Sequence, residues 1–165
     1  MTGLEADIEG QAGSDCRTVI VVHPKERRSK CTVEALRTHP DLRFVTFPRP
    51  VVLNPATYVR IGLGGPQLSL ADRNSGLLLL DGTWRRAAQM EPTFAHLPVR
   101  SLPSLVTAYP RKSILFEDPQ EGLATVEALY AALRITGRSV AGILDHYYWK
   151  QEFLERNGWQ EDETC

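Results

Sequence analysis

Apolar residues in the first hundred positions fall into short runs without regular polar alternation. Residues 18–22 read Thr-Val-Ile-Val-Val, and residues 77–80 are four leucines followed by Asp81. Runs of this kind are typical of strands that are buried on both faces, as in a parallel sheet. The pattern also predicts short strands at 42–47, 51–53 and 99–102, and it leaves 55–66 as a glycine-containing loop.

Helical spacing dominates after Pro103. One predicted helix carries an apolar face made of Leu123, Val126, Leu129, Tyr130 and Leu133. A second amphipathic helix is predicted from 140 to 154, with Asn157-Gly158 as its end. Strands followed by helices predict an α/β fold with two lobes, an α/β lobe at 18–103 and a helical lobe at 104–165. Residues 1–17 are expected to form a flexible acidic tail.

Shorter helices are predicted in the α/β lobe. Residues 68–73 and 84–90 have helical character, and another helix is expected to begin at residues 31–34, with Thr32 as its N-cap. The helix at 84–90 follows the leucine strand directly, so Asp81-Gly82-Thr83-Trp84 forms a strand-to-helix turn. In open α/β folds functional groups collect at the carboxyl ends of strands, which makes this turn the best candidate for a site.

The residues of the turn each have two interpretations. Asp81 is either a reactive carboxylate or a cap for the following helix. Trp84 is either the wall of a pocket or a core aromatic beneath the sheet. Thr83 is a candidate cap, and Gly82 is explained by the backbone conformation of a sharp turn. Glu127, in the alanine-rich helix, reads as a helix-surface residue.

Charge is distributed unevenly along the chain. The 165 residues have a net charge of −1, but residues 16–151 hold 18 basic and 11 acidic residues, a net charge of +7. A basic body with acidic ends fits a polyanion partner, although solvated surface charge explains such an imbalance equally well. The candidate contacts to the phosphates of such a partner are Lys25, Arg27, Arg28, Lys30, Arg85, Arg86, Arg111 and Lys112.

Cysteine and histidine usage argues against metal and disulfide chemistry. Cys16, Cys31 and Cys165 are far apart, which favours free thiols in a reducing, cytoplasmic location. The four histidines have no ligand spacing, so no metal is expected. The N-terminus lacks the basic region of a signal peptide, and no apolar run approaches the ~20 residues of a membrane span.

Several motifs resemble the DTW-domain superfamily, in particular its ribosomal-RNA branch. Asp81-Gly82-Thr83-Trp84 is similar to the Asp-x-Thr/Ser-Trp signature of these proteins. Five further segments resemble family motifs in the same order: residues 23–32, Leu68-Ser69-x-Ala71-Asp72-Arg73, residues 100–108, residues 122–128 and Trp149-x-x-x-Phe153-Leu154-x-x-Asn157. The resemblance covers about residues 18–158.

The resemblance implies an S-adenosylmethionine-dependent 3-amino-3-carboxypropyltransferase that modifies uridine or pseudouridine in rRNA or tRNA. It also implies a SPOUT-like parallel sheet with a deep trefoil knot, followed by an all-helical lobe, in a protein that is a monomer. By the same resemblance Asp81 is catalytic, as a base or as a holder of the amino acid tail. Cofactor contacts would come from Thr32, Leu80, Thr83, Trp84, Leu102, Leu123, Ala124 and Thr125.

Two other functions fit the same features. A SPOUT-type RNA methyltransferase would use the same cofactor but transfer its methyl group. A non-catalytic RNA-binding or ribosome-assembly factor would keep the fold and bind RNA without the cofactor. The intact Asp81, Thr83 and Trp84 favour the transferase.

Overall fold

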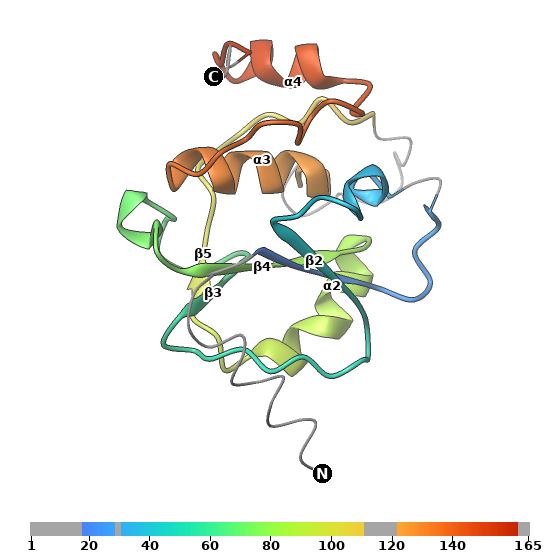
Figure 1. Cartoon of the computed structure of the whole chain (residues 1–165), viewed down its shortest axis with the longest axis vertical. Coiled ribbons are helices and arrows are strands. Elements are labelled where there is room, and N and C mark those ends of the chain that lie inside the picture. Colours follow the sequence, from blue (N-terminus) through green and yellow to red (C-terminus); the bar gives the residue numbers. More distant parts are fainter. Residues whose placement is uncertain (1–17, 29–30, 111–121, 162–165) are drawn as a thin grey trace.

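A parallel sheet of five strands forms the middle layer of the protein (Figure 1). The computed structural model describes residues 18–28, 31–110 and 122–161. The strands are β1 (Thr18–Val22), β2 (Leu42–Thr46), β3 (Tyr58–Ile61), β4 (Gly76–Asp81) and β5 (Val99–Arg100), and their order in the sheet is β2-β1-β4-β3-β5. β1 and β4 are the central pair, with Val22 aligned to Asp81. Their apolar sequences suit this place, because both faces of the sheet are covered.

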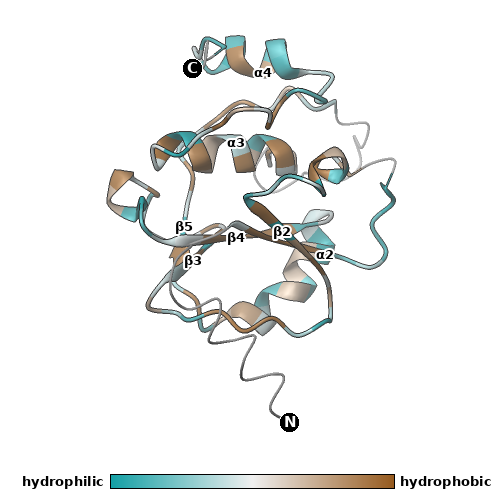
Figure 2. Cartoon of the chain, in the orientation of Figure 1, coloured by the Kyte–Doolittle hydropathy of each residue, from teal (hydrophilic) through white to brown (hydrophobic). Residues whose placement is uncertain are grey.

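Helices cover the two faces of the sheet. α3 (Thr125–Ile135) lies on one face with α4 (Lys150–Arg156) beyond it, and α2 (Trp84–Met90) lies on the other face (Figure 1). Within the described residues, short 3-10 helices lie at Glu34–Leu36, Leu70–Asp72 and Glu91–Phe94. Figure 2 shows mainly hydrophobic residues in the sheet layer and a mixture of hydrophobic and hydrophilic residues on α3 and α4. Mixed helices of this kind bury one side and expose the other.

The alternation of side chains along β1 and β4 divides the core into two parts. Ile20 and Leu79 belong to the cluster on the α3 face, together with Leu129 and Phe153. Val21 and Leu78 point to the opposite face and pack in the cluster that contains Met90, Phe94 and Leu97. Successive strand residues face opposite sides, so each central strand contributes to both clusters. The sheet and the C-terminal helices therefore share one core, and a division into two lobes stays a prediction.

Most of the predicted elements are confirmed. β1, β4 and α2 begin and end close to the predicted residues, and strands at 42–47 and 99–102 exist in shortened form. The short helix at 68–73 is present as the 3-10 turn at Leu70–Asp72, and its first turn is capped by Ser69 and Asp72. The first amphipathic helix is α3, and α4 ends at Arg156 with Asn157 as its C-cap, before Gly158 with its positive φ of 69°. These elements carry strong local signals.

The prediction of a strand at 51–53 and a loop at 55–66 is wrong. Residues 51–53 are irregular, whereas Tyr58–Ile61 forms β3 between β4 and β5. Four residues give little pattern, and Arg60 at the third position obscured it. The Arg60 side chain is nevertheless only 10% exposed and lies 3.6 Å from Glu91. Pairing with two neighbouring strands, which local sequence does not encode, determines this strand.

Two predicted helices also differ from the structure. Residues 140–149 are turns and irregular backbone in place of a helix, because Gly142 has a φ of +77° and interrupts any helical path. Residues 34–36 form only a 3-10 turn, preceded by Val33 with no side-chain cap. Thr32 caps nothing in that turn. Residues 1–17, which are predicted to form a flexible acidic tail, lie outside the described residues.

Candidate active site

The carboxyl ends of β1 and β4 meet at a switch in chain direction. The chain leaves β1 toward β2 on one side, and it leaves β4 toward β5 on the other side. Ligands of open α/β folds bind in the crevice that such a switch creates. The backbone N–H of His23 donates to the carbonyl oxygen of Asp81 at 3.0 Å, which joins the two strand ends. Asp81 thus stands at the place where the fold favours a site.

The Asp81 side chain is buried and held from two sides. Only 3% of the residue is exposed. The Thr125 hydroxyl donates to Oδ1 at 2.6 Å, and the Cys31 thiol donates to Oδ2 at 3.0 Å. Burial raises the pKa of Asp81 above its ordinary value, although the bonds from Cys31 and Thr125 oppose that rise. The carboxylate is therefore oriented by two donors in a desolvated place.

The alternative role of Asp81 as a helix cap is wrong. Thr83 is the N-cap of α2, and its hydroxyl oxygen accepts the backbone N–H of Arg86 at 3.3 Å. The alternative for Trp84 is also wrong, because 45% of this residue is exposed and a core aromatic would be covered. The guanidinium of Arg85 lies 5.2 Å from the centre of the Trp84 ring. The face of this tryptophan therefore accepts cations in the protein itself.

A cleft of about 230 Å³ opens beside Asp81. Its walls come from the ends of β3 and β4, from α2 and from the start of α3. The lining residues are Ile61, Leu79, Leu80, Gly82, Trp84, Ala87, Gly122, Leu123, Thr125 and Ala128. Most of these side chains are apolar, so the cleft suits a flat apolar group with a polar or cationic end near Asp81 and Trp84.

Four of the predicted cofactor residues line this cleft: Leu80, Trp84, Leu123 and Thr125. Thr32, Thr83, Leu102 and Ala124 do not. The Thr32 hydroxyl oxygen accepts the backbone N–H of Val126 at 3.1 Å, and Leu102 packs against the core. Cofactor contacts by these four residues stay predictions.

Sequence reasoning missed other lining residues. Ala87 and Ala128 lie one helical turn after Trp84 and Thr125, so helical spacing could have found them. Ile61 lies in β3, a segment that the sequence predicts as a loop. Gly122 and Leu79 carried no signal beyond a turn residue and a core residue.

Glu127 is not a surface residue, contrary to the sequence prediction. It is completely buried, with an exposed fraction of 0%. Oε1 accepts the Thr107 hydroxyl at 2.6 Å and the Ala124 backbone N–H at 2.8 Å. Oε2 accepts the Ala108 backbone N–H at 2.8 Å and the Tyr147 hydroxyl at 3.0 Å. These four bonds tie the segment at 107–108 and the turn at 144–147 to the start of α3, which forms part of the cleft wall.

Comparison with known proteins identifies the family. Residues 51–161 match the family described as "Ribosome biogenesis protein, C-terminal". The chain belongs to this family. A solved structure, the SAM-dependent rRNA:acp-transferase Tsr3 from Vulcanisaeta distributa, is similar with a TM-score of 0.65 and 26% sequence identity. That match covers 87% of this chain and 80% of that chain. No curated protein matches the chain.

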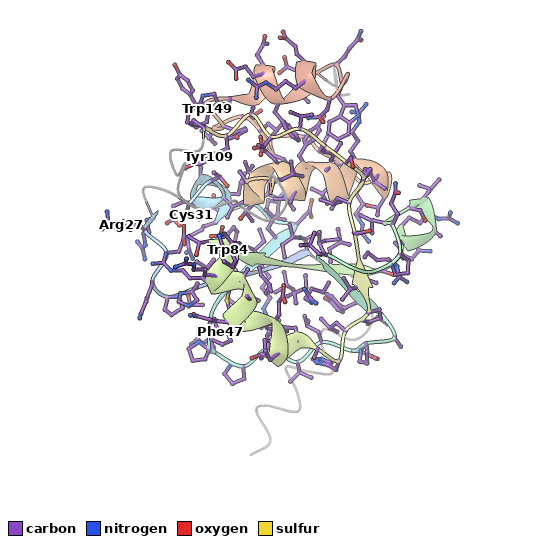
Figure 3. The ribbon with its side chains drawn as sticks, turned by 180° about the vertical axis from the view of Figure 1, so that it is seen from behind. Arg27, Cys31, Phe47, Trp84, Tyr109 and Trp149 are labelled. Atoms are coloured by element: carbon purple, nitrogen blue, oxygen red, sulfur yellow. The ribbon has the colours of Figure 1, made fainter. Side chains whose placement is uncertain are left out.

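The predicted RNA contacts of this ribosome biogenesis family member differ in their surroundings. Lys25, Arg27 and Arg28 are exposed on the segment after β1, and Figure 3 shows Arg27 projecting outward on the same side as Cys31 and Trp84. Arg86 is partly buried in an ion pair with Glu26 at 2.9 Å. Lys30, Arg111 and Lys112 lie outside the described residues.

Two further properties concern the part of the chain that the structure describes. Its histidine, cysteine, aspartate and glutamate side chains form no group of three or more that could hold a metal ion. None of the helices in residues 18–28, 31–110 and 122–161 has the length and hydrophobicity needed to cross a membrane.

Proposed function

We propose that this protein transfers the 3-amino-3-carboxypropyl group of S-adenosylmethionine to a uridine or pseudouridine of rRNA. The observation that carries the proposal is the buried carboxylate of Asp81, which accepts two side-chain hydrogen bonds and lies beside an apolar cleft. The chain is also similar to an rRNA:acp-transferase. The finer features expected from the DTW-domain resemblance belong to the same proposal: the SPOUT-like knot, the helical lobe at 104–165 and the monomeric, cytoplasmic state.

The residues of the cleft fit S-adenosylmethionine. Ile61, Leu80 and Leu123 provide apolar surface for an adenine ring, and the exposed Trp84 face suits a sulfonium cation. Asp81 supplies the negative charge that an ammonium group requires. The volume of about 230 Å³ lies below the ~300 Å³ typical of small ligand pockets. We therefore expect the ligand to be only partly enclosed, which leaves its reacting carbon open to RNA.

Positioning accounts for the contribution of the protein to catalysis. The bound cofactor supplies a γ-carbon activated by the neighbouring sulfonium. A nitrogen of the base forms the new bond to that carbon, the carbon–sulfur bond breaks with its electron pair, and methylthioadenosine leaves. The nitrogen loses its proton to a base, a role open to Asp81, which is equally suited to hold the ammonium group of the tail.

Both roles require Asp81 to be ionised. Because burial raises the pKa of Asp81, its ionised fraction falls at a higher pH than for an ordinary aspartate. We expect transfer to decrease as the pH is lowered through this raised pKa. Around the site, we assign cofactor contacts to Leu80, Trp84, Leu123 and Thr125, with Thr32, Thr83, Leu102 and Ala124 as further candidates. The exposed Lys25, Arg27 and Arg28 would contact phosphates.

Isotope transfer tests the proposal directly. The purified protein is incubated with rRNA and S-adenosylmethionine labelled either in the aminocarboxypropyl chain or in the methyl group. We expect label from the chain in rRNA nucleosides, no methyl label, and loss of transfer in Asp81→Asn. The exposed Tyr148→Phe variant serves as the matched control and should keep full activity, because 87% of Tyr148 is exposed.

Other results would support other functions. Transfer of the methyl label would show a methyltransferase. RNA binding without calorimetric binding of S-adenosylmethionine would show a non-catalytic ribosome biogenesis factor. Label in tRNA and not in rRNA would refute the rRNA part of the proposal alone.

A further inference from the structure

The two oxygens of Asp81 are held by different kinds of donor. Oδ1 accepts a short bond of 2.6 Å from the Thr125 hydroxyl, at the first residue of α3. Oδ2 accepts a bond of 3.0 Å from the thiol of Cys31, in the segment that follows β1. A thiol is a weak hydrogen-bond donor compared with a hydroxyl. A stronger donor therefore displaces the thiol from Oδ2 more easily than it displaces the hydroxyl from Oδ1.

The position of Cys31 is set by its neighbour. The Thr32 hydroxyl oxygen accepts the backbone N–H of Val126 at 3.1 Å. This N–H belongs to the first turn of α3, where backbone donors have no partner within the helix. Consecutive residues thus bond to the end of β4 and to the start of α3. The contact between the thiol and Asp81 is part of a bridge joining three segments that are distant in sequence.

We propose that Cys31 is a positioning residue that holds Oδ2 of Asp81 until a nitrogen donor of the substrates replaces the thiol. Thr125 keeps Oδ1 throughout, so the carboxylate offers one oxygen in one direction. That donor is the N–H of the target base or the ammonium group of the aminocarboxypropyl tail. The inference rests on the proposed role of Asp81 and adds which of its oxygens reacts.

Burial and the neighbouring charges keep the Cys31 thiol protonated. Burial, and then the bond and charge of Asp81, raise the pKa of Cys31 to about 12. Glu34 adds to this rise, while Glu26 raises and Arg37 lowers the pKa of Asp81. Glu26 itself forms an ion pair with Arg86 at 2.9 Å. At neutral pH Cys31 is therefore a donor and a poor nucleophile.

Thiol reactivity tests the contact without any transfer reaction. In a chain with Cys16→Ser and Cys165→Ser, only Cys31 remains to react with iodoacetamide. We expect slow alkylation whose rate rises about tenfold per pH unit up to pH 10, because only the thiolate reacts. Asp81→Asn removes the negative charge with little change of shape. This substitution should speed alkylation at pH 8 about tenfold or more. The alkylation rate should also reach its plateau at a lower pH than in the parent chain, because the pKa of the thiol falls.

Controls separate the contact from simple burial. Glu34→Gln removes a charge that contributes less, so it should speed alkylation less than Asp81→Asn does. A change in the access of iodoacetamide to Cys31 would multiply the alkylation rate equally at every pH. It would not move the pH at which the rate levels off. An equal rate in the Asp81→Asn chain and its parent, or an equal effect of both substitutions, would overturn the proposal.

A pH profile links the contact to catalysis. Cys31→Ala removes a bond that lowers the pKa of Asp81, so the acidic limb of the transfer profile should move to higher pH. Cys31→Ser restores a donor and should return the limb to the parent position or below. A loss of activity in both variants with unmoved limbs would show a merely structural thiol and would refute the proposal. If no transfer is found at all, the alkylation result still decides whether the contact exists.

Discussion

Tyr147 offers a clean measurement of the buried network around Glu127. Its hydroxyl donates to Oε2 of Glu127 at 3.0 Å, and only 8% of the residue is exposed. Burial and the neighbouring Glu127 raise the pKa of Tyr147 further above its ordinary value, so the hydroxyl stays a donor at all moderate pH values. Tyr147→Phe removes this donor and leaves the ring in place.

The expected loss follows from the type of bond. A hydrogen bond to a charged group contributes about 1.5–3 kcal/mol to stability. Glu127 keeps its three other donors, so no charge is left unpaired and we expect about 2 kcal/mol. For a chain of this size that corresponds to a fall of about 4–8 °C in melting temperature. Urea denaturation, followed by tryptophan fluorescence, measures the free energy of unfolding.

The neighbouring tyrosine is the matched control. Tyr148 is 87% exposed, so Tyr148→Phe should change the free energy of unfolding by less than about 0.5 kcal/mol. Glu127→Gln should cost more than Tyr147→Phe. Its amide has a single acceptor oxygen, so its NH₂ must face the backbone N–H of either Ala124 or Ala108. Equal stabilities of the Tyr147→Phe and Tyr148→Phe variants would refute the reasoning.

Three further outcomes are expected. Asp81→Asn should abolish transfer yet raise the melting temperature at pH 8. Burial raises the folded-state pKa of Asp81, so ionisation of this group opposes folding as the pH rises. The gain in melting temperature should therefore vanish near pH 4, where the carboxyl is protonated in the folded protein. Trp84→Ala should weaken calorimetric binding of S-adenosylmethionine about 2- to 30-fold with little change in melting, because the side chain is half exposed. Gly65→Ala should cost about 1–3 kcal/mol in urea denaturation. Its added Cβ would lie 2.2 Å from the carbonyl oxygen of Val99, and a smaller loss than for Tyr148→Phe would contradict this.

The path of the chain around the site was partly readable from local pattern. The four leucines before Asp81 predicted β4, and the turn through Gly82 and Thr83 predicted α2 from Trp84 to Met90. Such elements are decided by neighbouring residues, through burial on both faces and through capping. Local pattern therefore places Asp81 and Trp84 at a strand end. The same pattern does not separate the two interpretations of each side chain.

Only the tertiary structure decided which partners these residues meet. Cys31 and Asp81 are 50 positions apart, and Glu127 meets Thr107 and Tyr147 across 20 positions on either side. A glutamate among alanines looks the same in sequence whether it faces solvent or four buried donors. Likewise, β3 exists because β4 and β5 pair with it, and not because its four residues favour a strand. The sequence by itself determined the strongly apolar strands, the helix after β4 and the place of the carboxylate, because those depend on short-range pattern. The cleft, the donors on Asp81 and the burial of Glu127 depend on long-range packing, which local pattern does not contain.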